Sequence, residues 1–394
     1  MAFQYRVRDP LGNEHHGTID AKSREDAQQQ LRRDGFHVLH VEEDDEGSLF
    51  PRRVKKGEII YATNQLAIMV DTGITLSVAL ESICEQEENP TLRRVLMDLK
   101  KAVESGEDFS HALEKHPKYF DRTYIALVRA SEATGTLGEM LERIAGYLRK
   151  ELETRGKVKA SLAYPAVMGT LAVVVTIFLL TYILPKFEPL FSRKGAKLPG
   201  ITVFMMSISR YLIDYWYLWL LGITSLVAGI AYGKQTTRGR RVLDYLKINL
   251  PIFGPLFRKV TISRSVRTLG TLVASGVSVL EALRLSAEVA GNYYYEQLWK
   301  DVLEDVTSGN QIYQQLARSP LFPSMLVQMV RSGEETGKLD VVLEKVSNYY
   351  DGEVEMSLKT TTSLIEPVMI TGMGVLVGGI AIGLLLPIFS MSRQ

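Results

Sequence analysis

The chain has 394 residues, a length that predicts two or three structural units rather than one. Its 46 Lys and Arg residues nearly balance 45 Asp and Glu residues, so the overall charge gives no support to a nucleic-acid partner. The single cysteine, Cys84, excludes an internal disulfide and any multi-cysteine metal site. A mean hydropathy of +0.02 with 23% charged residues requires the apolar residues to be concentrated in particular segments.

The first 45 residues predict a small β-β-α-β module. Alternating apolar residues favour short strands near residues 3–7, 16–19 and 36–41. Ser23 and Asp26 have the spacing of a capping box at the start of a helix, and Gly35 is placed to end it. An acidic run and Pro51 then predict a solvated linker over residues 46–57.

An internal repeat organises the rest of the chain. Leu66, Val70 and Gly73 recur as Leu269, Val273 and Gly276 at one constant spacing. The correspondence covers about 120 residues and ends, in both copies, with an apolar segment of membrane-spanning length. Apolar residues at helical spacing predict two bundles of about six short helices each, over residues 58–161 and 234–363. Helix ends are expected at Gly73, Gly106 and Gly135, and Asn89 before Pro90 predicts a helix start.

Three apolar runs are long enough to cross a bilayer. We assign the spans to residues 162–184, 211–233 and 364–389. Their uncharged parts, Leu162–Leu184, Tyr215–Gly233 and Pro367–Phe389, contain no Asp, Glu, Lys, Arg or His. Transporters and proton pumps usually need such groups within the membrane, so the spans are expected to act as anchors.

The distribution of basic residues predicts the topology. No secretory signal is visible at the amino terminus, which we expect to be cytoplasmic. Residues 234–267 hold nine basic residues and one acid, Asp244, which favours the cytoplasmic side and anionic lipid. Residues 185–210 are then a periplasmic loop and 390–394 a periplasmic tail, although five basic residues in that loop leave the first hairpin alone ambiguous. The chain is expected to be a multi-pass protein of the bacterial inner membrane.

Motifs for covalent chemistry are missing from the sequence. The nearest string to a phosphate-binding loop, Gly333–Lys338, has the wrong spacing and lacks the following hydroxyl residue. His111 and His116 are five residues apart and would point to different helix faces, while Glu85, Glu87 and Glu88 fit a solvated face better than a cation site. We expect no enzyme activity, no cofactor and no metal.

The segments entering and leaving the spans resemble a known family. Lys157, Tyr164, Pro165 and Pro185 in the first copy, with Glu366, Pro367 and Pro387 in the second, are similar to the signature of the bacterial type II secretion system F family, which includes type IV pilus inner-membrane platform proteins. The resemblance covers nearly the whole chain. It implies a platform that links a cytoplasmic hexameric secretion ATPase to pilin or pseudopilin subunits, alongside other inner-membrane assembly proteins, membrane lipid and further copies of itself, with no nucleic acid.

Two repeated strings are candidate partner contacts: Glu132, Thr134, Gly135 and Leu137, and Glu334, Thr336, Gly337 and Leu339. One interpretation is a helix C-cap and turn, with the glutamate supporting the start of the next helix. The other is a rim that docks the ATPase. Both remain open from sequence.

Residues of the spans have two interpretations as well. Pro165 and Pro367 are expected near span entrances, with a structural role or a pilin contact. Small residues allow helices to approach closely. The third span therefore has a candidate packing face, for self-association or for pilin contact: Gly372, Gly374, Gly378, Gly379 and Gly383.

Two other protein classes fit the anchors and bundles. These are a membrane-anchored adaptor or receptor unrelated to pilus machinery and a transporter component. The family resemblance disfavours both, but it does not separate pilus assembly from protein secretion or DNA uptake. Acidic surplus over residues 81–114 and 301–355 leaves bundle surfaces suited to a protein partner.

Overall fold

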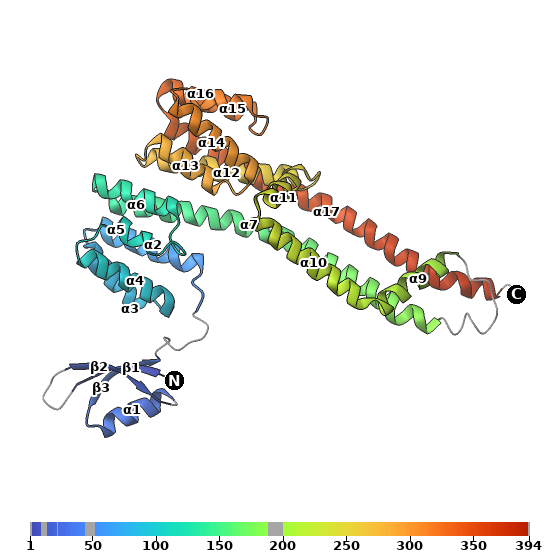
Figure 1. Ribbon diagram of the computed structural model, residues 1–394, viewed down its shortest axis with the longest axis horizontal. Helices are drawn as coiled ribbons and strands as arrows, with labels where there is room; N and C mark the ends of the chain where they lie inside the picture. Colours follow the sequence, from blue (N-terminus) through green and yellow to red (C-terminus); the bar gives the residue numbers. More distant parts are fainter. Residues whose placement is uncertain (1, 9–13, 22, 44–51, 188–199, 393–394) are drawn as a thin grey trace. The chain divides into compact units, whose positions relative to one another are not determined.

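The computed structural model describes residues 2–8, 14–21, 23–43, 52–187 and 200–392. The described chain forms two compact units, Met1–Ala145 and Gly146–Gln394. Figure 1 labels the elements in chain order.

The amino-terminal module has the predicted β-β-α-β order. Its elements are β1 (Ala2–Arg8), β2 (Glu14–Asp20), α1 (Arg24–Arg33) and β3 (His37–Glu43). The antiparallel sheet has strand order β2-β1-β3, and Val7 packs with Ala27 and Leu31 of α1 in a small core. The Ser23 hydroxyl accepts a hydrogen bond from the Asp26 N–H at 3.2 Å, as the capping pattern predicts.

The first bundle contains six helices, counting the start of α7. They are α2 (Lys56–Asp71), α3 (Leu76–Gln86), α4 (Pro90–Glu104), α5 (Phe109–Glu114), α6 (Arg122–Thr134) and α7 (Leu137–Phe178). The apolar stripe of α4 is buried, with Leu92 and Leu99 almost inaccessible to solvent. Asn89 starts α4 as predicted, because its Oδ1 accepts a hydrogen bond from the Thr91 N–H at 3.1 Å.

The second bundle repeats the first helix for helix. It contains α12 (Gly254–Ala274), α13 (Val279–Val289), α14 (Tyr293–Thr307), α15 (Ile312–Arg318), α16 (Ser324–Thr336) and the start of α17 (Leu339–Ser392). Gly73 and its repeat partner Gly276 have φ values of 90° and 78°, and Gly135 and Gly337 have 73° and 68°. This left-handed conformation favours glycine, so the predicted helix ends are confirmed in both copies.

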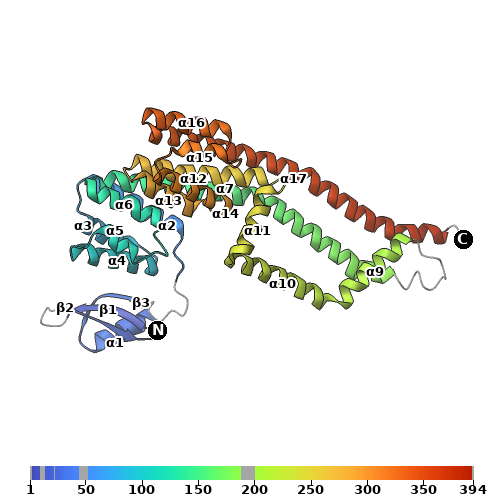
Figure 2. The same cartoon turned by 45° about the horizontal axis from the view of Figure 1, so that its top comes forward.

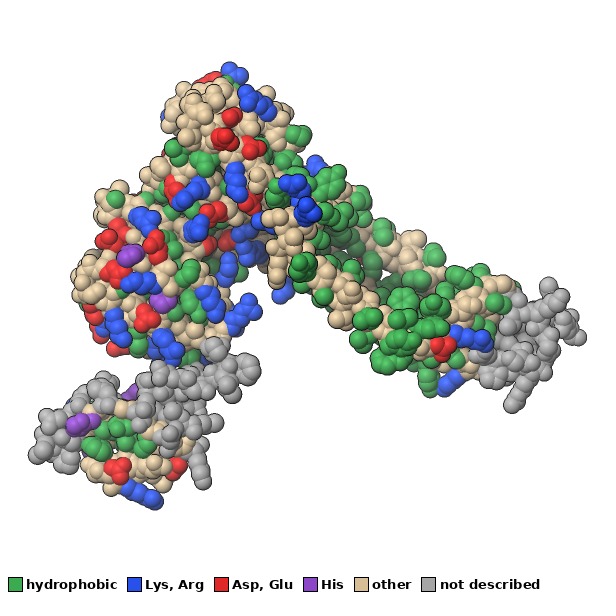
Figure 3. All heavy atoms as spheres, viewed as in Figure 1, with side chains coloured by type: hydrophobic (Ala, Val, Ile, Leu, Met, Phe, Trp, Pro, Cys, Tyr) green, Lys and Arg blue, Asp and Glu red, His purple; other side chains and the backbone are tan. Residues whose placement is uncertain are grey.

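Three helices of the described chain are long and apolar enough to cross a membrane. The first is α7, which continues through a π-helical segment, η2 (Leu179–Ile183), and the others are α10 (Trp216–Gln235) and α17. Figure 3 shows apolar side chains gathered over these long helices and charged side chains over the bundles. Apolar side chains left exposed along whole helices are expected where lipid, rather than water, surrounds them. The predicted three-span membrane architecture is confirmed.

Two helices were not predicted as separate elements. α9 (Gly200–Asp214) occupies part of the segment expected to be a loop, and α11 (Thr237–Asn249) follows α10 directly. Met206 of α9 packs with Leu180 and with Ile380 of α17. These contacts with distant segments stabilise α9, and the local sequence pattern does not reveal them.

Candidate functional site

The turn between α6 and α7 and the turn between α16 and α17 carry the predicted partner-contact strings. In the first, the Gly135 N–H donates to the Ser131 carbonyl, and the Thr136 N–H donates to the same oxygen at 3.2 Å. In the second, the Lys338 N–H donates to the Gly333 carbonyl at 2.9 Å. Both turns therefore end a helix in the same way, and the next helix begins at Leu137 or Leu339.

The glutamate of each string has a role that differs from the expected one. Glu132 Oε1 accepts a hydrogen bond from the Ser110 N–H at 3.0 Å, at the start of α5. Glu334 accepts two, from the N–H groups of Ile312 and Tyr313 at 2.7 and 2.9 Å, at the start of α15. Each carboxylate thus supports the amino terminus of the preceding short helix, not of the next helix. A carboxylate there satisfies free N–H groups and faces the positive end of the helix dipole.

The exposed parts of the strings are the threonines and glycines. Thr134, Gly135, Thr336 and Gly337 are exposed, whereas the glutamates and leucines are half-buried. The Thr134 hydroxyl lies 2.7 Å from that of Thr136, and the Thr336 hydroxyl donates to the Ser332 carbonyl at 2.6 Å. We call these four exposed residues the rim. Within the two strings, the rim is the exposed part, and each glutamate is engaged within its own bundle.

The family-signature residues lie on the two long helices. Lys157 Nζ is 2.9 Å from a carboxylate oxygen of Glu355 on α17. Pro165 lies inside α7, and Pro367 has the corresponding place in α17, so both prolines are accommodated within continuous helices. Tyr164, Glu366 and Pro367 are exposed and Pro185 is half-buried. Pro387 is within α17, but its side chain lies outside the described part.

The glycines of α17 divide into two groups. A Cβ atom at Gly372, Gly374 or Gly378 would meet open space. A Cβ atom at Gly383 would lie 2.5 Å from Met205 Sδ, and one at Gly379 would lie 3.5 Å from Met205 Cε. The close approach that glycine allows is therefore made to α9 at Gly383, and Gly379 beside it is in ordinary contact distance of Met205. The other three face no neighbour among the described residues.

A cluster of charged residues joins α7, α12 and α17 in the second unit. Asp351 forms an ion pair with Arg267, accepts a hydrogen bond from the Ser263 hydroxyl at 2.7 Å and lies 3.7 Å from Lys150. Nearby, Glu151 pairs with Arg264 at 2.9 Å and its repeat partner Glu353 pairs with Lys259 at 2.7 Å. Arg264 and Lys259 both lie on α12, so no local spacing in α7 or α17 indicates these ion pairs.

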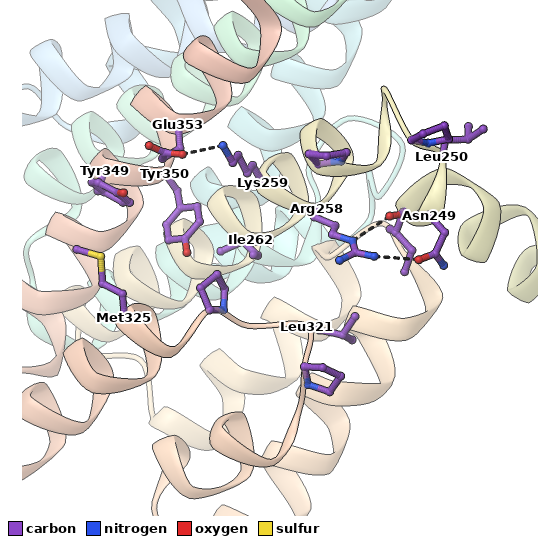
Figure 4. A pocket seen from close by; sticks show the side chains of 15 residues that line it. Asn249, Leu250, Arg258, Lys259, Ile262, Leu321, Met325, Tyr349, Tyr350 and Glu353 are labelled. Carbon is purple, nitrogen blue, oxygen red and sulfur yellow. Dashed lines mark hydrogen bonds and ion pairs between the residues drawn. The ribbon is translucent and has the colours of Figure 1, made fainter. Parts of the chain in front are cut away.

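A pocket of about 570 Å³ lies in the second bundle (Figure 4). Prolines of the turns before α12 and α16 form part of its wall, with Tyr349 and Tyr350 of α17. At its edge, Arg258 Nε donates to the Ile248 carbonyl at 2.9 Å. Tyr349 is 46% exposed and Met325 is 52% exposed. Tyrosine, methionine and arginine are enriched in protein interfaces, so this pocket suits a partner segment. The sequence did not predict the pocket, because its walls come from segments that are distant along the chain.

Other titratable residues of the described ranges were also candidates for chemistry. No group of three or more His, Cys, Asp or Glu residues is arranged to hold a metal there. His111 lies 2.9 Å from Glu107, and His116 lies 3.9 Å from Asp98. Burial raises the pKa of the Cys84 thiol to about 11, which disfavours the reactive thiolate.

The comparisons with known proteins agree with the duplicated fold. The family model described as type II secretion system (T2SS), protein F, matches residues 62–185 and again residues 265–387. The chain belongs to the type II secretion system protein F family. A separate model for the N-terminal domain of protein F matches residues 1–42. The two matched copies contain the bundles and the long helices described above.

Proteins similar to this chain are named for type IV pilus assembly or for type II secretion. The chain is 38% identical to type IV pilus assembly protein PilC of Thermus thermophilus over 99% of this chain and 98% of that protein. It is 38% identical to PilC of Myxococcus xanthus over 86% of this chain and 81% of that protein. It is 28% identical to type II secretion system protein F of Vibrio cholerae over 100% and 98%.

Proposed function

We propose that this chain is a platform protein of the bacterial inner membrane in a type IV pilus or type II secretion machine. It couples a cytoplasmic hexameric ATPase to the insertion or extraction of pilin or pseudopilin subunits. The observation that carries the proposal is family membership over both copies of a bundle joined to a long apolar helix. Full-length similarity to proteins named for pilus assembly and for secretion supports the same role.

The proposed topology places both bundles in the cytoplasm. The amino-terminal module over residues 1–45, the linker and the first bundle precede the first span, and residues 234–363 lie between the second and third. The basic surplus of residues 234–267 supports this orientation, because positive charge is retained on the cytoplasmic side. Reporter fusions at Gly195 and Gly291 test it: periplasmic activity at Gly195 and cytoplasmic activity at Gly291 are expected, and the reverse would contradict it.

The rim is the proposed docking surface for the ATPase, and ATP hydrolysis by that partner supplies the energy. The rim is exposed in both copies while the adjacent glutamates hold the bundle together. Two equivalent surfaces on one chain suit a partner made of repeated subunits. Acidic surfaces on the bundles add complementarity to a basic partner face.

Gly374 and Gly378 lie four residues apart on one face of α17, with Gly372 on the opposite side of the helix. The face of Gly374 and Gly378 is the proposed contact for other membrane helices. Gly372, Gly374 and Gly378 face no neighbour in the described chain, and small residues let helices pack closely. A second copy of the chain or the apolar helix of a pilin subunit would occupy this face.

Deleting the gene and complementing it tests the proposed function. We expect the deletion strain to lose surface pili or the secreted enzymes of the machine, and the intact chain to restore them. Neighbouring genes for a retraction ATPase or for secretion pseudopilins would assign the machine. Normal pili and normal secretion in the deletion strain would contradict the proposal and favour an unrelated adaptor.

A further inference from the structure

The junction of α10 and α11 is unusually close. A Cβ atom on Gly239 of α11 would lie 2.6 Å from Gly233 Cα and 2.5 Å from its carbonyl oxygen, at the end of α10. No side chain fits at that distance, so glycine at residue 239 lets the chain turn sharply after a membrane-spanning helix. Figure 2 shows α11 running from the end of α10 towards α12.

A groove of about 720 Å³ lies between the two helices beside this junction. Its lining includes Leu226, Gly229 and Ile230 of α10, and Val242 and Leu243 of α11. Nothing lies within 4 Å of a Cβ atom built on Gly229, so the groove is open beside this residue. Arg238 is the charged residue that lines the groove, and it is exposed.

The opposite face of α11 is fixed to the second bundle. Asp244 is buried and accepts hydrogen bonds from the Tyr293 N–H at 2.9 Å and from Lys247 at 2.6 Å. Arg240 pairs with Glu296 at 2.7 Å. The bundle therefore holds α11 in place, and the groove is a built feature of the second unit.

We propose that this groove binds an anionic phospholipid of the surrounding bilayer, with an acyl chain along α10 and the phosphate at Arg238. One apolar wall belongs to α10, a helix that is long and apolar enough to span the membrane. Arg238 lies just beyond the end of α10, in the first turn of α11, at the level where headgroups lie. A charge-assisted hydrogen bond from a guanidinium suits a phosphate oxygen.

The closed end of the groove favours a lipid over another helix. Small residues at Ser225, Gly229 and Gly233 would also admit a spanning helix. Such a helix continues beyond the membrane, however, and α11 closes the groove where Gly239 meets Gly233. A phospholipid does not extend past this junction, because its acyl chains end at the headgroup on the membrane surface. The inference needs α10 in a bilayer and does not depend on the proposed pilus or secretion partners.

Native mass spectrometry of the purified full chain in detergent tests the proposal. Phosphatidylglycerol and phosphatidylcholine with identical acyl chains are titrated separately. We expect tighter retention of phosphatidylglycerol by the wild type. Arg238→Gln should weaken phosphatidylglycerol binding about tenfold, as for one lost charge-assisted hydrogen bond, with little change for phosphatidylcholine. Gly229→Leu fills the groove and should weaken both.

Two control variants make the outcome decisive. Ala228→Leu introduces the same side chain one residue away, outside the groove lining. Arg284→Gln removes an exposed cation from α13. Both variants should bind lipid like the wild type. Equal retention of the two lipids with no effect of Arg238→Gln would overturn the proposal. So would a dimer that Gly229→Leu abolishes while lipid binding is unchanged, because a helix would then be the occupant. If Gly229→Leu fails to fold, Arg238→Gln decides.

Discussion

Lys157 Nζ lies 2.9 Å from a carboxylate oxygen of Glu355 and joins the family-signature part of α7 to α17. Both side chains are about half exposed, so water screens the pair. Asp351, one turn earlier in α17, is 14% exposed and pairs with Arg267, which is 13% exposed. The two ion pairs connect the same region but differ in burial.

This difference predicts unequal effects on stability. Lys157→Ala should change the free energy of unfolding little, because water screens this exposed ion pair. Asp351→Ala should lower it by about 3 kcal/mol, because it leaves the Arg267 cation buried without its carboxylate. Denaturant titration in detergent micelles measures both. Equal effects of the two substitutions would contradict a larger contribution of the buried Asp351–Arg267 pair to stability.

The glutamates of the repeated turns should act on stability through the preceding helix. Glu132→Ala should cost about 1 kcal/mol and Glu334→Ala about 2 kcal/mol, since the latter loses two N–H partners. Hydrogen exchange at the start of α5 or α15 should rise in the same variants. Glu335→Ala is the matched control, as this neighbour is exposed and pairs with Arg331. An equal loss in the control would mean that the cap is unimportant.

Replacing the turn glycines by alanine should lower stability, because the backbone at these positions is left-handed. A Cβ atom at Gly135 or Gly337 meets open space, but φ is 73° or 68°. Gly135→Ala and Gly337→Ala should therefore each lose about 1 kcal/mol of stability. Gly146→Ala also meets open space but lies within helix α7, and should gain about 1 kcal/mol. Thermal unfolding of the three variants checks the opposite signs.

The Cys84 thiol should report unfolding of the first bundle. Burial raises its pKa to about 11, so the folded protein has almost no thiolate at pH 8, and alkylation by iodoacetamide should be slow until denaturant is added. Reaction of the folded state should rise only as the pH approaches 11. A protein with Cys84→Ala and Gln86→Cys, whose new thiol is exposed, should react rapidly at pH 8. Rapid labelling of folded Cys84 would contradict its burial.

Much of the architecture could be predicted because local signals are strong. The glycine at each helix end, the Asn89 cap and the three apolar runs depend on a few neighbouring residues. The repeat extended each of these signals to the second copy. The expected β-β-α-β order likewise follows from alternation and one capping pattern.

The missed features depend on contacts between distant segments. Glu132 binds an N–H group 22 residues away, so spacing within its own turn pointed to the wrong helix. α9 is stabilised by packing against η2 and α17. The pocket in the second bundle and the α10–α11 groove each need a backbone turn that the sequence does not reveal. The partner contacts at the rim and at Gly372, Gly374 and Gly378 stay predictions.

Co-purification of the cytoplasmic ATPase with the full chain tests the central claim most directly. The variant pair Thr134→Arg and Thr336→Arg alters the rim. The control pair Thr72→Arg and Thr307→Arg alters threonines that are equally exposed and, like the rim threonines, donate to the carbonyl four residues earlier. We predict that the wild type and the control pair retain the ATPase and that the rim pair loses it about tenfold. Equal retention by both pairs, or no ATPase with the wild type, would contradict the account.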